Sequence, residues 1–331
     1  MTGAILASWP DGAVPGKRFA DRLMDIILHL GAHRTGTTTF QHYLRDQGAF
    51  LEERGVVLWG PHHCRDHVFP GLFRNVARQK GRNIARRAEG RARMLAAQAS
   101  VKGAAHLLVS DENLLGTCIQ NLRAGRLYPA AGERAARIAA AFGQSLNRIV
   151  LSIRSQELYW ASAAALTVSR GHPVPTPAQL DAIARSRRGW RDVITDLACA
   201  VPTAQIRVLP FEVHGGRPDA LLAAALDLAP PPDTEARWLN RSLDQRGLRS
   251  LLREQGADPE QVPEGTGRWQ PFNDAQIADL RETYSDDLHW LTAGADGLAE
   301  LTETWRDTRA GSNLPRRAAE KGQGHDKGQL A

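Results

Sequence analysis

Residues Ile26–Leu44 read IILHLGAHRTGTTTFQHYL, and this stretch decides the fold. It opens with a short apolar run ending at Gly31, and this length and boundary predict a buried strand. Gly31 and Gly36 then bracket a tight loop, after which apolar residues recur at helical spacing. The N–H groups of such a loop and the positive end of the next helix dipole converge on one point. The stretch therefore predicts an anion site, to which Arg34 adds a fixed positive charge.

The glycine-bounded loop differs from the P-loop of nucleotide triphosphatases. That loop follows G-x-x-x-x-G-K-[ST], with a lysine directly after the second glycine. Here Thr37 follows Gly36, and the cationic Arg34 comes two residues before Gly36. The run Gly31–Gln41, GAHRTGTTTFQ, resembles instead the 5′-phosphosulfate loop of the sulfotransferases that use 3′-phosphoadenosine-5′-phosphosulfate (PAPS). Against the common P-K-T-G-T-T wording, His33 replaces the proline and Arg34 the lysine.

The resemblance implies that this loop binds the phosphosulfate end of PAPS. The residues that it assigns to the cofactor here are Arg34, Thr35, Gly36, Thr37, Thr38 and Thr39. The simpler alternative is a helix capped by threonine after a glycine-rich turn, with Arg34 merely solvated.

A second cationic segment follows the fourth predicted strand and reads RSQELYWAS, Arg154–Ser162. Arg154 should lie at the carboxyl end of that strand, and Ser162 about one and a half turns into the next helix. A guanidinium and a hydroxyl so placed can hold one phosphate from two sides. The 3′-phosphate site of the sulfotransferase family has the same order, an arginine after a strand and a serine eight residues later. The alternative is a surface ion pair for Arg154 and a serine without a ligand.

Two later segments resemble the family more weakly. Leu239–Ser242 is similar to its L-N-x-S turn. Gly265–Trp269 is similar to the loop that closes over the 3′-phosphate, although its spacing departs from the G-x-x-G-D-W form.

Strands that alternate with helices predict an α/β fold, a parallel sheet flanked by helices. The resemblance implies the P-loop NTPase-like sulfotransferase fold, with a helical carboxyl-terminal part. After the first strand, further strands are expected at Val56–Trp59, His106–Val109, Arg148–Ile153 and Ile206–Phe211. Helices are expected at Phe73–Ser100, Pro129–Phe142, Thr176–Ala200, Leu221–Leu226, Leu243–Glu254 and Asp274–Leu291, and a loop at His62–Pro70.

The domain organisation follows from the same pattern. We expect residues 1–22 to be a loose leader, residues 23–305 a single sulfotransferase-like domain and residues 306–331 a disordered basic tail.

Composition fits a globular protein, because 42% of the 331 residues are hydrophobic. No apolar run approaches the ~20 residues of a membrane helix, and no basic segment marks a cleaved signal, so we expect a cytoplasmic protein. The three cysteines, Cys64, Cys118 and Cys199, are far apart and are expected to be reduced, buried thiols. The histidines at 62, 63 and 67 have no second ligand cluster, so no metal is expected.

The net charge of +6 is concentrated in two segments. Residues 74–93 carry eight basic side chains against Glu89, and residues 309–331 carry five against two acidic ones. We expect residues 74–93 to form a solvated helix face. The alternative is an electrostatic collar for an anionic cofactor or acceptor. No motif and no interleaved aromatic residues point to nucleic-acid binding.

The resemblance implies in-line transfer of the PAPS sulfuryl group to a hydroxyl or amine of a small-molecule or carbohydrate acceptor. Such catalysis depends on positioning and on charge stabilisation. Arg34 would stabilise the leaving phosphate, although a guanidinium, with a pKa above about 12, cannot lend a proton as lysine can. Glu112, just after the third strand, is the first candidate for the base; the alternative is an acidic residue at a helix amino terminus, where the dipole favours it. The alternates are His33, His62, His63 and His67.

Two other interpretations stay open. Leu107–Glu112 resembles a Walker B strand, in which Asp111 would hold magnesium for an ATP-dependent kinase or NTPase. The absence of a lysine after Gly36 speaks against that interpretation. A non-catalytic scaffold would instead bind a partner through residues 74–93.

Overall fold

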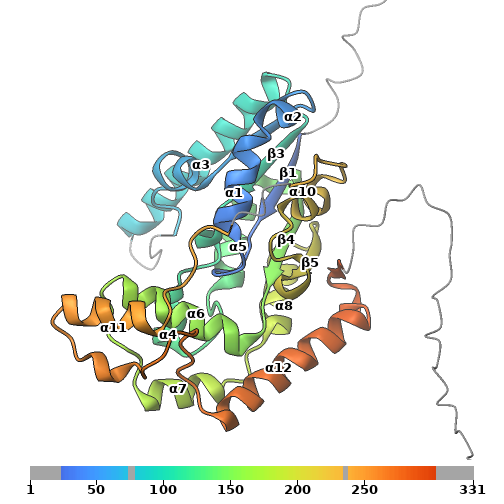
Figure 1. Ribbon diagram of the computed structural model, residues 1–331. Coiled ribbons are helices and arrows are strands. Elements are labelled where there is room, and N and C mark those ends of the chain that lie inside the picture. The colour runs from blue at the N-terminus through green and yellow to red at the C-terminus, as the bar shows by residue number, and fades with distance from the viewer. Residues whose placement is uncertain (1–23, 74–78, 234–237, 303–331) are drawn as a thin grey trace, which may run out of the picture.

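The computed structural model describes residues 24–73, 79–233 and 238–302 (Figure 1). One sheet of six parallel strands runs through these residues, and helices flank it, so the predicted α/β fold is confirmed. The expected leader and basic tail, residues 1–22 and 306–331, lie outside the described residues. The division into leader, domain and tail therefore stays a prediction.

The strands and helices have the following bounds. The strands are β1 (Asp25–His29), β2 (Val56–Trp59), β3 (His106–Ser110), β4 (Leu146–Ile153), β5 (Gln205–Pro210) and β6 (Glu300–Leu301). The α-helices are α1 (Thr37–Asp46), α2 (Gly48–Glu52), α3 (Gln79–Val101), α4 (Cys118–Ala124), α5 (Ala131–Phe142), α6 (Gln156–Ser169), α7 (Pro177–Ala184), α8 (Trp190–Ala200), α9 (Phe211–His214), α10 (Pro218–Leu226), α11 (Gln245–Glu254) and α12 (Asp274–Thr292).

The strand order β2-β3-β1-β4-β5-β6 places β1 inside the sheet. Leu28 of β1 is in register with Val109 of β3 on one side and with Ile149 of β4 on the other. The chain visits β2 and β3 on one side of β1 and then crosses to β4 and β5 on the other. Since ligands of open parallel sheets bind where the strand order reverses, the carboxyl end of β1 is the expected ligand edge.

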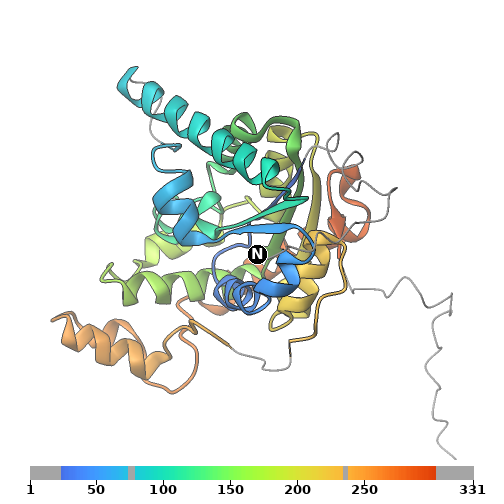
Figure 2. The same ribbon diagram turned by 90° about the horizontal axis from the view of Figure 1, so that it is seen from above.

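Helices flank the sheet on both faces (Figures 1 and 2), and an apolar core lies on each face. Ile27 and Val150 face one side, where they belong to a cluster with residues of α1, α2 and α10. Their neighbours Leu28 and Ile149 face the other side, in a larger cluster with residues of α3, α5, α8 and α12. Because both faces are buried, the middle of each central strand, Ile26–Leu28 in β1 and Ile149–Leu151 in β4, is apolar and shows no alternation with polar residues.

The structure differs from the predicted elements in several places. Helix α4 was not predicted, and Phe211, expected to end the fifth strand, begins α9. His62–Pro70, expected to be a loop, contains a short π-helix, η1 (His63–Val68), whose Cys64 and Val68 are buried in the larger core. The chain after Glu212, expected to be wholly helical, returns to the sheet as the two-residue strand β6, which pairs with β5. A turn of π-helix and a two-residue strand are both too short to produce a periodic pattern.

The thiols follow the expectation in part. Cys64 and Cys118 are buried and free, whereas Cys199 is free but exposed, so its predicted burial is wrong. Cys199 lies near the end of the amphipathic helix α8, on the face opposite the buried Val193 and Leu197. None of the described helices combines the length and the apolar content that a membrane crossing requires.

Candidate functional site

The loop after β1 is fixed against β4 at the carboxyl edge of the sheet. Leu30 N–H donates to the Val150 carbonyl at 2.9 Å, and Ala32 N–H donates to the Ser152 carbonyl at 3.0 Å. The loop ends at Gly36, whose φ of 79° lies in the left-handed region that favours glycine. The chain therefore enters α1 from a backbone position that packing on β4 determines.

The N–H groups in the first turn of α1 receive no side-chain cap from the residues that the structure describes. The cap residue of α1, Gly36, has no side chain that could accept from them, and no acidic residue lies in the turn. The helix dipole adds partial positive charge at the same place. Gly36, Thr37 and Thr38 all line a cavity of about 450 Å³, which is within the range of small-molecule sites.

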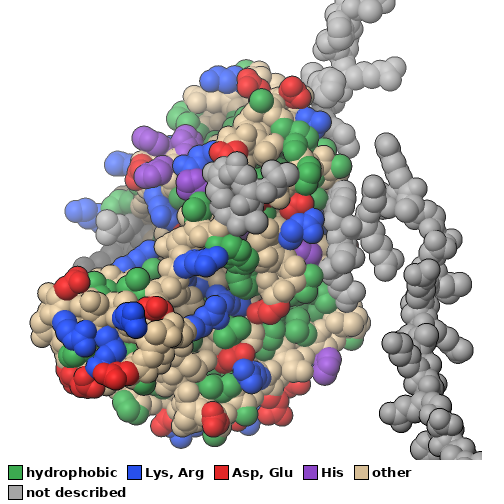
Figure 3. Space-filling view, viewed as in Figure 1, with side chains coloured by type: hydrophobic (Ala, Val, Ile, Leu, Met, Phe, Trp, Pro, Cys, Tyr) green, Lys and Arg blue, Asp and Glu red, His purple; other side chains and the backbone are tan. Residues whose placement is uncertain are grey.

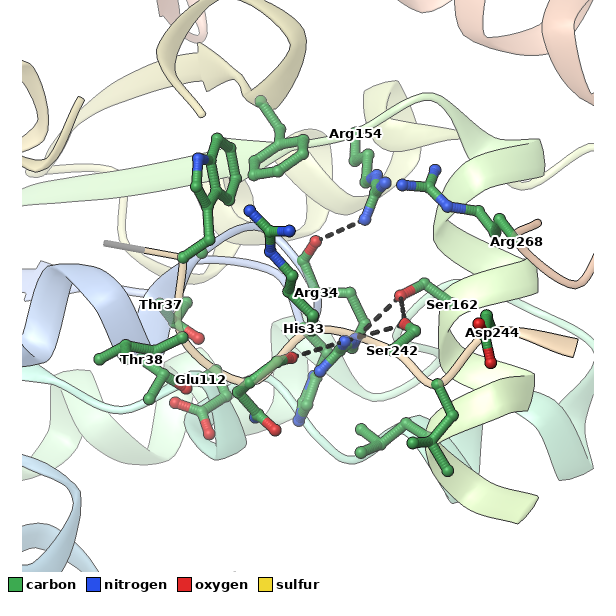
Figure 4. A pocket seen from close by; sticks show the side chains of 18 of the residues that line it. His33, Arg34, Thr37, Thr38, Glu112, Arg154, Ser162, Ser242, Asp244 and Arg268 are labelled. Atoms are coloured by element: carbon green, nitrogen blue, oxygen red, sulfur yellow. Dashed lines mark hydrogen bonds between the residues drawn. The ribbon is translucent and has the colours of Figure 1, made fainter. Parts of the chain in front are cut away.

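Arg34 reaches from the loop across this cavity (Figure 4). Its Nε donates to Ser162 Oγ of α6 at 2.9 Å, and its Nη2 donates to Ser242 Oγ at 2.9 Å and to the Asn240 carbonyl at 2.8 Å. Burial lowers the pKa of Arg34, and the positive charges of Arg170 and Arg268 lower it further. The guanidinium is thus held entirely by neutral oxygen atoms.

Arg154, directly after β4, enters the same cavity from the other side of the loop (Figure 4). Its Nη1 donates to the Arg34 carbonyl at 2.8 Å, and its guanidinium lies 4.6 Å from the centre of the Phe211 ring. The side chain is buried, and its Nε has no hydrogen-bond partner within the described part of the chain. Burial, followed by the nearby charges of Arg268 and Arg34, lowers the pKa of Arg154 to about 10.

Positive charge in the cavity exceeds negative charge. Five arginines line it, against two acidic residues; the arginines are Arg34, Arg154, Arg170, Arg241 and Arg268, and the acids are Glu112 and Asp244. Within residues 24–73, 79–233 and 238–302, none of these five guanidinium groups forms an ion pair with a carboxylate. Lys and Arg side chains accordingly gather in the middle of the face in Figure 3. Of the five, Arg154 is buried and Arg34 is partly buried, and because buried charge without a protein partner is costly, this part of the cavity is suited to an anionic ligand.

The eight residues assigned to the cofactor divide into two groups. Six of them line the one cavity, namely Arg34, Gly36, Thr37, Thr38, Arg154 and Ser162. The other two are buried and support its walls. Thr35 Oγ1 donates to the Ala32 carbonyl at 2.6 Å within the loop, and Thr39 Oγ1 accepts from Leu239 N–H at 3.2 Å. Thr39 thereby positions the segment that carries Asn240 and Ser242.

Glu112, the first candidate for the base, also lines the cavity. Its Oε2 accepts from Gln41 Nε2 at 3.1 Å, and its Oε1 accepts from Arg65 Nη2 at 3.0 Å. Burial raises the pKa of Glu112, but its backbone hydrogen bond, Arg65 and Gln41 together lower the pKa below its usual value. The carboxylate is therefore charged at neutral pH, and it keeps lone pairs for a further donor.

His33 is the only one of the four alternate histidines in the described cavity lining. Its Nδ1 shares a hydrogen bond of 2.8 Å with Tyr128 Oη, and its Nε2 shares one of 3.0 Å with the Asn113 side chain. Burial lowers the pKa of His33, so the imidazole is neutral at neutral pH with both ring nitrogens occupied. His62, His63 and His67 lie at η1, outside the cavity lining.

Asp111 is the residue that would bind magnesium in a Walker B strand, but its carboxylate already accepts hydrogen bonds from Arg65. The side chain is buried, and both carboxylate oxygens accept from Arg65 Nε, at 3.2 and 3.1 Å. Arg65 Nη2 donates to Oδ1 at 2.5 Å, as does Asn113 N–H at 3.0 Å. Asp111 does not line the cavity, and the described residues contain no cluster of three or more His, Cys, Asp or Glu that could hold a metal.

The basic segment forms the amino-terminal half of α3, apart from Arg74 and Arg78, which lie outside the described residues. The side chains of Lys80, Arg82, Arg86 and Arg87 are exposed. Figure 2 shows this end of α3 and helix α11 on opposite sides of the molecule. No described residue of α3 lines the cavity, so Lys80, Arg82, Arg86 and Arg87 form a solvated helix face. Arg91 instead donates to the Val68 and Pro70 carbonyls, and Arg93 donates to the Ala140 carbonyl. For Arg74 and Arg78 the collar stays a prediction.

Several cavity residues were not assigned from the sequence. Arg268 comes from the loop Gly265–Trp269, and it reaches the cavity because its strand-like pairing with Asp244 closes that loop onto the start of α11. Trp238 and Arg241 come from the segment before α11. Arg170 lies eight residues after Ser162, and this helical spacing is a signal that the sequence does contain.

A scan against protein-family models finds no match for this chain, and a search of curated proteins finds none either.

Proposed function

We propose that this chain is a PAPS-dependent sulfotransferase with a P-loop NTPase-like fold. The observation that supports it most is that Arg34 and Arg154, 120 positions apart in the sequence, line one cavity without carboxylate partners in the described chain. Two cationic positions on one cleft suit a nucleotide with a phosphate on each side of its ribose. The fold assignment is supported by the loop at the carboxyl end of β1, between β3 and β4.

The residues present fit the cofactor. Arg154, whose Nε lacks a partner, would hold the 3′-phosphate together with Arg268 and Ser162. The first turn of α1 and Arg34 would hold the 5′-phosphosulfate. Trp238 lines the cavity with a 43% exposed side chain, and its ring meets Phe211 edge to face at 5.9 Å, so it offers a surface for the base.

When bound, PAPS supplies an activated sulfuryl group. Arg34 would balance the negative charge that grows on the bridging oxygen, and it would do so without donating a proton. Glu112 would take the proton of the acceptor hydroxyl, because it is ionised at neutral pH and has free lone pairs. His33 is less suited to this task, since both of its ring nitrogens already form hydrogen bonds. His33 would instead fix the loop.

The rival kinase or NTPase interpretation has less support. It needs Asp111 as a magnesium ligand, but both oxygens of that carboxylate accept from Arg65. Scaffold binding through α3 would leave without a ligand the cavity arginines, which have no carboxylate partner among the described residues.

A thermal-shift titration in the presence of EDTA tests the proposal. We expect adenosine 3′,5′-bisphosphate (PAP) to raise the melting temperature without magnesium, since binding to the native state alone stabilises it. Mg-ATP should raise it less at equal concentration. Stabilisation by Mg-ATP with none by PAP would overturn the proposal in favour of the NTPase.

Turnover is the second part of the test. PAPS labelled in its sulfuryl group should transfer the label to a compound in a panel of phenols, sugars, alcohols and amines. Glu112→Gln should abolish the transfer and leave PAP binding intact, whereas a scaffold would transfer nothing with any variant.

A further inference from the structure

One face of α6 runs along the cavity. Ser162, Leu166 and Arg170 are spaced four residues apart, which puts them on the same side of a helix, and all three line the cavity. Arg170 is the residue at which α6 ends. With a rise of ~1.5 Å per residue, Arg170 lies about 12 Å further along the helix than Ser162. The cavity therefore extends well beyond the point where Ser162 meets Arg34.

The cationic groups of the cavity lie on two sides of Arg34. Figure 4 shows Arg154 and Arg268 on one side of Arg34, the proposed 3′-phosphate end, and Glu112 on the other side. Arg154 lies just before α6 and Arg170 directly after its last residue, so the two lie at opposite ends of a helix ~21 Å long. Arg170 is therefore at the end of the cavity away from Arg154, and in agreement with this the charges of both Arg170 and Glu112 act on the pKa of His33.

The proposed cofactor leaves Arg170 without a ligand. Its phosphates would be held by Arg34, Arg154, Arg268 and the start of α1. Arg170 is exposed, forms no ion pair in the described part of the chain and adds positive charge beside Arg34. Leu166 and the 41% exposed Leu243 line the same cavity and add apolar surface. A bound acceptor whose hydroxyl faces Glu112 would lie against Leu166, Leu243 and Arg170.

We infer that the acceptor is an anionic hydroxyl compound, whose carboxylate, sulfate or phosphate group binds Arg170 while its hydroxyl faces Glu112. This inference rests on the proposed function and names the substrate class of that site. The anionic group would offset the repulsion between Arg170 and Arg34, and the apolar residues between them would contact the body of the acceptor. A different role for Arg170 would be to complement the carboxyl-terminal dipole of α6, which affects stability but not acceptor choice.

Matched pairs of acceptors that differ only in charge separate these roles. The protein is saturated with PAP, and binding of 4-hydroxyphenylacetate and of its methyl ester is measured by calorimetry. Glucuronate and glucose form a second pair. We expect at least one anionic member to bind on the order of tenfold more tightly than its neutral partner, as a desolvated charge pair does. Arg170→Gln should remove this preference, and Arg170→Lys should keep part of it.

Arg82→Gln on the exposed face of α3 is the matched control, since it removes one positive charge far from the cavity, and it should change none of these affinities. Failure of PAP to bind would overturn the proposed function and, with it, this inference. Normal PAP binding with no preference for either anionic member would overturn the inference alone. A loss of PAP affinity in Arg170→Gln would also overturn it, because Arg170 would then belong to the cofactor site.

Discussion

Strand β4 has an arginine near each end, and the two guanidinium groups have opposite surroundings. Arg148, near the amino end, pairs with Asp227 at 2.5 Å and donates to the Ala225 carbonyl at 2.7 Å. Arg207 of the neighbouring β5 pairs with the same carboxylate. Arg154, just past the carboxyl end, is more deeply buried, yet it has no carboxylate partner among the described residues and one unbonded nitrogen.

Under the proposed function, this difference separates a structural charge from a ligand-binding one. Burial raises the pKa of Asp227, but Arg207 and Arg148 lower it more, and the net pKa is below its usual value. The amino-end pairs therefore stabilise the fold. At the carboxyl end, burial lowers the pKa of Arg34 and of Arg154, and the charge of Arg268 lowers both further, so these two guanidinium groups cost stability until an anion arrives. The contrast predicts that substitutions at the carboxyl end of β4 change ligand affinity, whereas substitutions at its amino end change the stability of the fold.

The largest effect is expected from Arg34→Ala. Loss of a charge that acts on the bridging oxygen should lower kcat on the order of 1,000-fold. The affinity for PAP should fall much less, since α1 and Arg154 remain. Single-turnover transfer of labelled sulfuryl measures the first effect and calorimetry the second. A variant with wild-type kcat would contradict the role of Arg34.

Arg154→Met should weaken PAP binding by about 100-fold, the ~3 kcal/mol typical of a buried charge contact. The unliganded protein should unfold at the same temperature or higher, because the substitution removes an unpaired buried charge. Calorimetry and thermal unfolding test both statements together. A marked loss of stability would show that Arg154 is structural, as Arg148 is.

Acid should lower the stability of the folded protein through protonation of His29, which lies at the carboxyl end of β1. Burial lowers the pKa of His29 from 6.5 to about 4. The folded state thus favours the neutral ring. The contribution of His29 to the free energy of unfolding is fully present above pH 6.5 and is lost as the pH falls towards 4. His29→Asn should remove a slope of ~1.4 kcal/mol per pH unit from stability in this window.

Denaturant unfolding at several pH values gives this slope. His62→Asn, a change at a fully exposed ring, is the control and should leave the slope as it is. Equal slopes for wild type and His29→Asn would mean that His29 is not held neutral.

The smallest effect is expected from Arg148→Met. Asp227 is half exposed and keeps Arg207, so we expect a loss of about 1 kcal/mol of stability. PAP affinity should not change. A variant that binds PAP several-fold less tightly would remove the distinction between the two ends of β4.

Local segments made much of this site predictable. The loop Gly31–Gly36 and the pair Arg154/Ser162 each lie at the end of an apolar strand, and strand ends of a parallel sheet meet at one edge. Both cationic segments can therefore be placed at the ligand edge from the sequence alone, without knowledge of any contact between them. The central strands were predictable for the same reason, since their apolar runs have clear ends.

Some residues lie in the cavity only because of contacts between segments that are far apart in the sequence, and the positions of strand ends do not predict them. Arg268 and Trp238 reach the cavity because Thr39 and the Asp244–Arg268 pairing hold the segments around α11 over it. No periodicity encodes these contacts. The hydrogen bonds from Arg65 to Asp111 could not be predicted either. Arg65 lies in η1, a π-helix in a stretch whose sequence predicts a His-rich loop.

The central claim is that Arg154 binds a phosphate which ordinary adenine nucleotides lack. Calorimetric titration of wild type and Arg154→Met with PAP and with adenosine 5′-monophosphate, in EDTA, tests it most directly. We predict that wild type binds PAP on the order of 100-fold more tightly than the monophosphate, and that Arg154→Met binds the two about equally. Equal affinity of the wild-type protein for both nucleotides would contradict the account.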